Sequence, residues 1–335
     1  MKILVTPTSF KKKENSKARE LLESFADEVI YNELGHPLSS EEVISMLDDI
    51  DGYIAGVDTI DKAAIQAAPK SLKVISRYGA GFDRVDIEAA NAKGITVTNT
   101  PGVNSIAVAE LAFGLMLCAA REIPFAHNEV MAGKWVSKNG IELNGKTLGI
   151  LGLGAIGKNL ALRALAFHMS VIAYDPYMDK DFASAHGIKV GTLEEVLSSA
   201  DFLSLHLPHN QNTHHIIDER AISLLPEGAI IINTARGGLI DEDALLAALN
   251  SGHLRMACMD AFEKEPPQAS PLFQSGKIIV TPHAGAHTAT VCAMGLKAVE
   301  NLIAVLTGKE CKILLNNEVT LMEKPKYFQR SKNAV

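Results

Sequence analysis

The sequence predicts an α/β protein built from parallel sheets covered by helices. Short apolar runs rich in β-branched residues alternate with helical segments along almost the whole chain, which is typical of parallel strands joined by crossover helices. The chain has 335 residues, which is long for one hydrophobic core and suggests two domains. A glycine motif with G-x-G-x-x-G spacing lies near the middle of the chain, so a large part of the protein precedes it.

Five candidate strands lie in the first hundred residues. Ser39 and, three residues later, Glu42 form the pattern of a capping box, so a helix is expected to start there. The apolar segment 105–120 is too short to span a bilayer and contains Glu110. It predicts a buried helix, part of a longer one over about 104–121. The strands are expected at 2–6, 28–31, 52–55, 72–76 and 94–98.

A polar segment near 122–144, which contains Trp135, shows no regular pattern and is expected to be irregular. The alternation of strands and helices then resumes. Thr192 followed by Glu195 marks another helix start, and a last helix is expected from about 287 onward to 307. Strands are expected at 147–151, 170–174, 201–206, 228–234, 255–260 and 277–283.

Charge and cysteine content exclude several classes of protein. The net charge is −7 and there is no long basic run, so binding to nucleic acid or to an anionic membrane is not expected. Cys118, Cys258, Cys292 and Cys311 are widely spaced and form no C-x-x-C pair, which argues against a metal module and a disulfide framework. No signal peptide is visible in the first ten residues, so a cytoplasmic protein without a metal is expected.

The glycine motif G-L-G-A-I-G follows a predicted strand and opens a predicted helix. Gly152 permits a tight turn, Gly154 lets the backbone approach a pyrophosphate, and Gly157 lets the helix pack on the strand. The helix starts with Ala155 and Ile156, and its N-terminus offers free N–H groups and a partial positive charge to phosphates. The motif predicts a dinucleotide-binding site; a glycine-rich packing turn is the alternative.

Asp175 ends the next predicted strand, 18 residues after Gly157. A carboxylate at this place can accept hydrogen bonds from the adenosine ribose and would repel a 2′-phosphate. No arginine follows in P-Y-M-D-K (176–180), so NAD is favoured over NADP. The simpler alternative is a solvated residue at the end of a strand.

Three successive predicted strands of the second half lead into Arg236, Glu265 and His283. Open parallel sheets bind ligands at the carboxyl ends of their strands, so these side chains are expected to converge. Arginine binds a planar carboxylate through two parallel hydrogen bonds, and histidine exchanges protons near neutral pH. A glutamate on the other ring nitrogen would orient the imidazole and stabilise its cation. The trio suits hydride transfer between a 2-hydroxy acid and a 2-oxo acid.

Each member of the trio also has a simpler explanation. Arg236 could be a solvated loop cation, His283 a structural histidine, and Glu265 a turn residue before Pro266. Their joint placement at strand ends favours the catalytic interpretation. His206, at another strand end, is the competing base, and we assign it a cofactor-lining role instead.

The motifs together resemble a known family. The glycine motif and Asp175 are accompanied by N-T-A-R-G-G (233–238), D-A-F-E-K-E-P (260–266), T-P-H-A-G-A (281–286), S-R-Y-G-A-G-F-D-R-V-D (76–86) and T-P-G-V-N-S-I-A-V-A-E (100–110). This set resembles the D-isomer-specific 2-hydroxyacid dehydrogenases over about residues 50 to 310. The motifs are most similar to the phosphoglycerate dehydrogenase branch of that family.

The resemblance implies two doubly wound parallel-sheet domains. A Rossmann-type NAD-binding domain, residues 101–286, would be inserted into a flavodoxin-like substrate domain made of residues 1–100 and 287–335. The helices at 104–121 and 287–307 would be the hinge connections. Substrate would bind in a cleft whose closure excludes water.

The resemblance also implies roles for individual residues. Arg236 would anchor the substrate, Glu265 would be the partner of the histidine, and His283 would be the acid/base. Asp260 would contact the nicotinamide carboxamide, and Asn104 would line the cleft. Backbone N–H groups of Tyr78, Gly79, Ala80 and Gly81 would bind the substrate carboxylate. Further cofactor contacts are expected at His206, Pro208, Thr213, Thr234, Ala235, Arg236, His283 and Gly285.

The native substrate is the least determined property. A D-3-phosphoglycerate dehydrogenase of serine biosynthesis is the first expectation, and Arg77 matches a phosphate-binding position of that branch. Asp58, however, stands where the branch commonly has a basic residue, and its charge is expected to repel a phosphate. The chain is also expected to lack the regulatory domain that many such enzymes append. Reduction of glyoxylate, hydroxypyruvate or another short 2-oxo acid is the alternative.

Two other expectations concern partners. Family members are commonly dimers, and the segment 122–144 with Trp135 is expected to form the subunit contact of a homodimer. A remote alternative is an NADH-sensing corepressor, a binding module with the same fold, but no peptide-docking groove is legible in the sequence. Short-chain and zinc-dependent dehydrogenases are excluded because the Tyr-x-x-x-Lys pair and a cysteine cluster are both missing.

Overall fold

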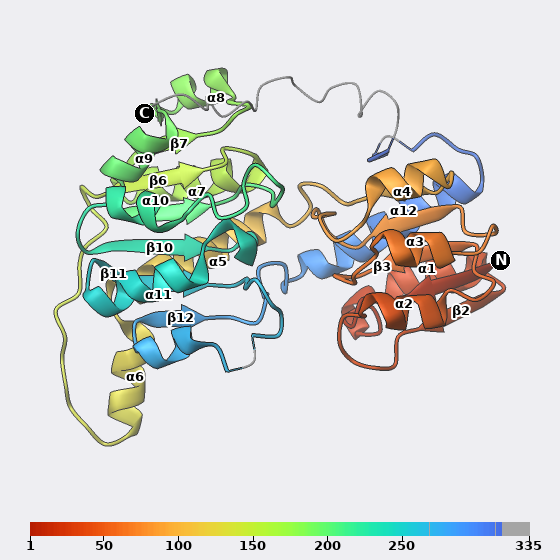
Figure 1. Cartoon of the computed structure of the whole chain (residues 1–335), viewed down its shortest axis with the longest axis horizontal. Helices are drawn as coiled ribbons and strands as arrows, with labels where there is room; N and C mark the ends of the chain where they lie inside the picture. Colours follow the sequence, from red (N-terminus) through yellow and green to blue (C-terminus); the bar gives the residue numbers. More distant parts are fainter. Residues whose placement is uncertain (268, 312, 317–335) are drawn as a thin grey trace. The chain divides into compact units, whose positions relative to one another are not determined.

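The computed structural model describes residues 1–267, 269–311 and 313–316 (Figure 1). The chain divides into two compact units. The first unit contains Met1–Asn104 and the described residues from His287 onward, and the second unit contains Ser105–Ala286. The last part of the predicted substrate domain, residues 317–335, lies outside the described residues.

The first unit is built on a five-stranded, fully parallel sheet with the strand order β2-β1-β3-β4-β5. This order is that of flavodoxin-like folds. The strands are β1 (Lys2–Val5), β2 (Glu28–Tyr31), β3 (Gly52–Ala55), β4 (Val74–Arg77) and β5 (Thr96–Thr98). The helices are η1 (Lys13–Asn15), α1 (Ser16–Phe25), α2 (Ser40–Met46), α3 (Lys62–Ala67), α4 (Ile87–Ala92) and α12 (Thr290–Leu306).

Helices cover both faces of this sheet because successive strand residues point to opposite sides. Ile3 and Val5 pack against α1 and α12, whereas Leu4 packs against α2, α3 and α4. The strands are buried on both faces, and they therefore read as continuous apolar runs in the sequence.

The second unit is built on a seven-stranded, fully parallel sheet with the order β12-β11-β10-β9-β6-β7-β8. The order reverses between β6 and β9, which is the topological switch point of a Rossmann-type fold. The strands are β6 (Thr147–Leu151), β7 (Ser170–Tyr174), β8 (Lys189–Val190), β9 (Phe202–Leu205), β10 (Ala229–Asn233), β11 (Leu254–Met259) and β12 (Ile278–Val280). The predicted α/β class with two doubly wound parallel sheets is confirmed.

The helices of the second unit also lie on both faces of its sheet. The core on one face includes residues of α5, α7 and α8, and the core on the other includes residues of α9, α10 and α11. The helices are α5 (Ser105–Ala120), α6 (Ile123–Met131), α7 (Ala155–Ala166), α8 (Lys180–Ala185), α9 (Leu193–Ser199), α10 (Glu219–Leu224), η2 (Gly237–Leu239), α11 (Glu242–Ser251) and η3 (Pro271–Ser275). Among the described residues, no helix has both the length and the apolar character needed to cross a membrane.

The capping boxes predicted at Ser39 with Glu42 and at Thr192 with Glu195 are both present. In each, the hydroxyl accepts a hydrogen bond from the glutamate N–H, and the glutamate carboxylate accepts one from the capping residue. Strand β8, by contrast, was not predicted from the sequence. It has two exposed residues at a sheet edge, so no apolar pattern marks it.

The prediction of an irregular segment at 122–144 is wrong in its first part, where α6 forms a helix. Glu122 begins the helix in a left-handed conformation with φ 51°, and a proline stands in the first turn. Because Val130 and Met131 are exposed, α6 has no buried stripe that a helical period would reveal. Residues 134–143 have no regular secondary structure, as predicted.

Candidate active site

The three motif glycines meet three different steric requirements. Gly152 has φ +100°, and a Cβ there would lie 2.7 Å from backbone atoms of His206. A Cβ on Gly157 would lie 2.1 Å from the carbonyl oxygen of Gly152, so only glycine lets the helix pack this closely. A Cβ on Gly154 would meet no atom within 4 Å, so the space in front of it is open. The tight turn, the open approach and the close packing are those of a pyrophosphate-binding loop.

Helix α7 begins inside this loop. Gly154 is its N-cap and supplies no side-chain cap, and Lys158 N donates to Gly154 O at 2.9 Å. The N–H groups of Ala155, Ile156 and Gly157 therefore belong to the first turn, where a helix has no partners of its own. These donors and the open space at Gly154 fit the phosphates of a dinucleotide.

Asp175 directly follows β7 and is hydrogen-bonded to this loop. Its Oδ2 accepts from Leu153 N at 2.8 Å, and its Oδ1 accepts from Tyr177 N at 2.7 Å. The carboxylate thus lies against the glycine loop, as expected of the residue that binds the ribose. Each oxygen retains acceptor capacity for a ribose hydroxyl.

His206 and Thr234 follow two paired strands, β9 and β10. His206 Nδ1 and Thr234 Oγ1 are buried without a hydrogen-bond partner, whereas His206 Nε2 lies 2.9 Å from Ser204 Oγ. Buried polar atoms are normally paired, so these two atoms mark a place for a polar ligand. Burial lowers the pKa of His206 to about 3. The imidazole is therefore neutral near pH 7, which disfavours it as the proton donor.

The loop after β9 holds two further residues that the resemblance assigned to the cofactor. Pro208 is exposed, whereas Thr213 is buried. The Thr213 hydroxyl donates to Pro208 O at 2.6 Å and accepts from Asn210 N at 2.9 Å. The hydroxyl thus binds the backbone of its own loop, and the expected cofactor contact stays a prediction.

The structure brings His283 and Glu265 together as predicted. His283 Nδ1 lies 2.9 Å from Glu265 Oε1, and the same oxygen accepts from Phe262 N at 3.2 Å. The side chains of His283 and Glu265 are 36% and 19% exposed. A proton on Nδ1 points to the carboxylate, which leaves Nε2 as the atom that can exchange a proton with a ligand. His283 itself has a left-handed backbone with φ 51°.

Arg236 lies in the turn after β10. Its Nη1 donates to Ala235 O at 2.7 Å, and its own carbonyl accepts from Asn233 Nδ2 at 2.8 Å. Asn233 is fully buried, and its Oδ1 also accepts from Ala235 N at 3.0 Å. Sequence reasoning missed this positioning role of Asn233, although it stands first in N-T-A-R-G-G. A Cβ on Gly237 would lie 1.8 Å from Phe262 C, so the turn packs directly on the loop that bears Glu265.

Asp260 has a structural role that sequence reasoning did not predict. It is 2% exposed, its Oδ1 accepts from Ala284 N at 2.7 Å and from the Thr281 hydroxyl, and its Oδ2 accepts from Gly285 N at 2.9 Å. A buried carboxylate needs such donors to offset the loss of hydration. This carboxylate positions the loop that bears His283, and the expected contact with the nicotinamide stays a prediction.

The first unit contains a separate candidate site at residues 79–81, which we call the anion cradle. Its three consecutive carbonyl groups are all bonded within the unit, and none of its three N–H groups donates to another described atom. Successive free N–H groups form a concavity that binds anions such as carboxylates. The acceptors and donors are Gly79 O with Thr100 N (3.0 Å), Ala80 O with Asn99 Nδ2 (2.6 Å), and Gly81 O with Arg77 Nε (3.2 Å).

Two predicted substrate ligands lie beside the cradle, and for Tyr78 the predicted free N–H group is wrong. Tyr78 N donates to Ala55 O at 2.9 Å and its hydroxyl to Val291 O at 3.0 Å, so neither group faces a substrate. Arg77 is 3% exposed and bonds to Gly81 O. Its guanidinium therefore supports the cradle from a buried position, and a role in phosphate binding stays a prediction.

Three residues that follow β5 hold buried polar atoms without hydrogen-bond partners. Asn99 Oδ1, Thr100 Oγ1 and Asn104 Oδ1 are buried and unpaired. Asn99, which sequence reasoning missed, donates to the cradle from 19 positions away along the chain. Its only signal in the sequence is its place at the end of a predicted strand. Asn104 lies in the turn that ends the first unit.

Asp58 does not have the role inferred from the sequence. It is fully buried, and its carboxylate accepts from Leu38 N at 2.8 Å, Gly56 N at 2.8 Å, the Tyr53 hydroxyl at 3.0 Å and the Thr6 hydroxyl. Burial, together with the charge of Asp58, raises the pKa of Tyr53. The expected repulsion of a phosphate is corrected, because this carboxylate points into the core and is surrounded by donors.

The described residues contain no group of His, Cys, Asp and Glu side chains that could hold a metal ion. Residues 113–285 match a family model described as "D-isomer specific 2-hydroxyacid dehydrogenase, NAD binding domain". The chain belongs to this family. The resemblance stated from the motifs is confirmed, and the second unit is an NAD-binding domain of the D-isomer specific 2-hydroxyacid dehydrogenases.

Similar proteins include a D-3-phosphoglycerate dehydrogenase of Methanocaldococcus jannaschii, which is 44% identical over 295 residues, 87% of this chain and 56% of that protein. A solved glyoxylate reductase from Paecilomyes thermophila has a TM-score of 0.82 and 31% identity over 94% of this chain and 98% of its own. A D-lactate dehydrogenase from Aquifex aeolicus, solved with NAD and lactic acid, has a TM-score of 0.82 and 27% identity over 94% and 99%. The chain spans about half the length of the curated relatives it matches.

Proposed function

We propose that the protein is an NAD-dependent oxidoreductase that interconverts a D-2-hydroxy acid and its 2-oxo acid. The observation that supports this best is the 2.9 Å bond between His283 Nδ1 and Glu265 Oε1 at the carboxyl edge of the nucleotide-binding sheet. The turn that bears Arg236 packs on the loop that bears Glu265. An acid/base and a carboxylate-binding cation are thus held in one framework, as this reaction requires.

A bound nicotinamide dinucleotide would supply the hydride acceptor or donor. Arg236 binds the substrate carboxylate through two parallel hydrogen bonds. His283 Nε2 gives a proton to the carbonyl oxygen when the 2-oxo acid is reduced, and takes it back when the hydroxy acid is oxidised. Glu265 stabilises the imidazolium that is present when His283 holds this proton.

NAD is the proposed cofactor in preference to NADP. Asp175 places a carboxylate on the glycine loop through its bond to Leu153 N. A 2′-phosphate would meet this negative charge, whereas ribose hydroxyls can donate hydrogen bonds to it.

Among substrates, we propose D-3-phosphoglycerate, with glyoxylate, hydroxypyruvate or another short acid as the second candidate. The curated relatives named above support the first, and the buried position of Asp58 removes the electrostatic argument against a phosphate. The glyoxylate reductase, which matches over almost its whole length, supports the second.

The deciding experiment measures NADH oxidation with 2-oxo acids that do or do not bear a terminal phosphate. A kcat/KM preference for 3-phosphohydroxypyruvate would support the first substrate, and a preference for glyoxylate or hydroxypyruvate the second.

His283→Ala should lower kcat by about 10²–10⁴ and leave NADH affinity unchanged. His186→Ala, a change at an exposed histidine of the same unit, is the control. Normal turnover by the His283 variant would contradict the proposed acid/base.

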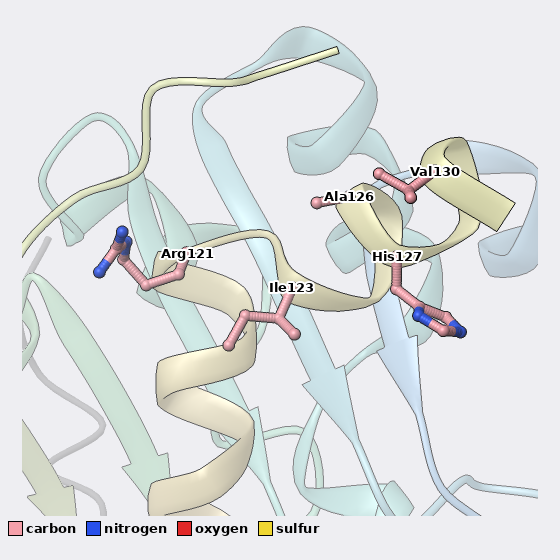
Figure 2. Close-up of a pocket in the computed structure, with 5 residues that line it drawn as sticks. All are labelled: Arg121, Ile123, Ala126, His127 and Val130. Carbon is pink, nitrogen blue, oxygen red and sulfur yellow. The ribbon is translucent and has the colours of Figure 1, made fainter. Parts of the chain in front are cut away.

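We also propose that the protein is a homodimer formed through α6 and the segment after it. A pocket of about 510 Å³ lies at this place, lined by Arg121, Ile123, Ala126, His127 and Val130 (Figure 2). Met131 is 74% exposed and Trp135 is 93% exposed, and apolar surface of this kind is typical of a protein–protein interface. Light scattering should give the mass of two chains, and a monomeric mass would contradict the proposal.

A cytoplasmic location belongs to the same proposal. All four cysteines are free thiols in the structure. Free thiols fit a reducing compartment, in which disulfides do not persist.

A further inference from the structure

Three histidines lie together in the segment between β9 and α10, outside the trio already described. His209 Nε2 is 3.2 Å from His214 Nδ1, and the rings of His214 and His215 stack with their centroids 3.9 Å apart. His209 and His214 are further arranged edge to face. The three rings form one continuous row.

One end of the row is bonded to the loop that bears Glu265. His215 Nε2 lies 2.5 Å from Glu263 Oε1, and Glu263 N donates to Glu242 Oε1 at 2.8 Å. His215 Nδ1 faces Asp241 Oδ2 at 3.9 Å. The backbone of His215 is left-handed with φ 48°, a conformation that residues other than glycine rarely adopt. This conformation costs free energy, and the contacts of the His215 side chain stabilise it.

The row also contacts the turn that follows Arg236, through His209 and His215. A Cβ on Gly238 would lie 2.6 Å from His209 Nε2, and His215 N donates to Gly238 O at 2.9 Å. The same turn is in contact with the loop that bears Glu265, because Gly237 packs on Phe262. The turn of Arg236 thus contacts both the histidine row and that loop.

We infer that His215 and Glu263 are positioning residues for the catalytic trio. Their bond ties the segment after β9 to residues 262–265 and so sets Glu265 against His283. We call this pair the histidine–glutamate clip. The inference rests on the proposed function, in which Glu265 orients the acid/base. Glu263 stands two positions before Glu265 in the same loop. The clip residues therefore act through the position of Glu265 and do not need to touch the substrate.

The clip is a half-exposed pair that lies among other titratable side chains. His215 and Glu263 are 32% and 39% exposed on their side chains, and the groups that face them are His214, Asp241 and Glu242. Burial raises the pKa of Glu242. An isolated exposed pair contributes little to stability, so the effect expected here is on geometry more than on folding.

Glu263→Ala should test the clip, since it removes the carboxylate and leaves the backbone bond to Glu242. We expect kcat to fall about tenfold with unchanged NADH affinity, because small displacements of a positioned catalytic group are costly. Glu263→Gln keeps an acceptor oxygen for the imidazole and should restore most of the turnover. His215→Gln provides a second disruption if Glu263→Ala does not fold. The control His186→Ala should have no effect.

A readout that does not depend on turnover separates this inference from the proposed function. The NMR signal of the His283 Nδ1 proton reports the 2.9 Å hydrogen bond to Glu265 and should move in Glu263→Ala in the same direction as in Glu265→Gln. An unchanged kcat together with an unchanged Nδ1 proton signal would overturn the clip. If the parent protein reduces no 2-oxo acid, the proposed function fails, and the Nδ1 proton signal alone then decides whether the clip orients Glu265.

Discussion

The two glycine-containing loops of this molecule, residues 79–81 and residues 152–157, present backbone N–H groups in different ways. In the second loop, the donors are the first turn of α7, and the motif glycines make room for it. In the first loop, no helix follows at once, and the donors are free because three carbonyl groups are turned inward and bonded. The loop at 152–157 depends on positions that have no side chain. The loop at 79–81 depends on side chains from other parts of the sequence that bind its carbonyl groups.

This difference explains why the spacing of residues alone predicts the glycine loop, whereas only the family resemblance pointed to residues 79–81. Steric requirements at close spacing produce a pattern of glycines within six residues, which any reader of the sequence can find. Asn99 and Thr100, which donate hydrogen bonds to the cradle, directly follow β5. Their distance from the cradle along the chain follows no fixed spacing. Polar side chains with a buried role therefore look like ordinary strand ends until the fold places them.

The strongest test of the comparison is Gly157→Ala against Gly154→Ala. The first methyl group would lie 2.1 Å from Gly152 O, so the backbone must shift. We expect a loss of about 3 kcal/mol in stability and NADH binding weakened more than about 100-fold. Gly154→Ala meets open space and should leave stability unchanged but weaken NADH binding about tenfold, since the methyl group occupies phosphate space. Thermal unfolding and NADH fluorescence titration measure both. Equal effects of the two substitutions would refute the steric assignment.

A smaller effect is expected from Asn99→Ala, which removes the donor to Ala80 O. The freed carbonyl should let the anion cradle relax, and KM for the 2-oxo acid should rise about five- to tenfold. NADH affinity should not change, because the cradle belongs to the other unit. Asn91→Ala, on the exposed side of α4, is the matched control. If Asn99→Ala keeps the parental KM, the cradle does not bind the substrate carboxylate.

The smallest predicted effect concerns pH. The pKa of His206 is about 3 in the folded protein against an ordinary value of 6.5, so the unfolded chain binds a proton that the folded chain does not. Stability is therefore lost as pH falls below 6.5, by ~1.4 kcal/mol between pH 7.5 and 5.5. Calorimetry should show a decrease of about 3 °C in the Tm of the second unit.

His206→Gln should make this decrease smaller, since glutamine does not titrate. The anion cradle should not contribute to this change in Tm, because an arginine such as Arg77 keeps its charge throughout this pH range. An equal decrease in Tm for the parent and the His206 variant would assign the pH dependence to another group.

The sequence predicted the fold well because its signals are local. Continuous apolar runs marked eleven of the twelve strands in the described part of the chain to within three residues at their ends. The strand that it missed, β8, buries no side chain, and the helix that it missed, α6, exposes its apolar residues. Where a segment buries nothing, the hydrophobic pattern contains no information about it.

The sequence by itself determined the family, the two parallel sheets, the glycine loop and the pairing of His283 with Glu265 as candidates. These depend on periodicity, spacing and strand ends, which the chain order contains. Only the tertiary structure decided what buried polar groups do. It turned Asp58 into the core, assigned Arg77 to the cradle, and gave both oxygens of Asp260 to the loop of His283. The physical reason is that a buried charge must find its hydrogen-bond partners in three dimensions, and those partners come from parts of the chain that the sequence does not place side by side.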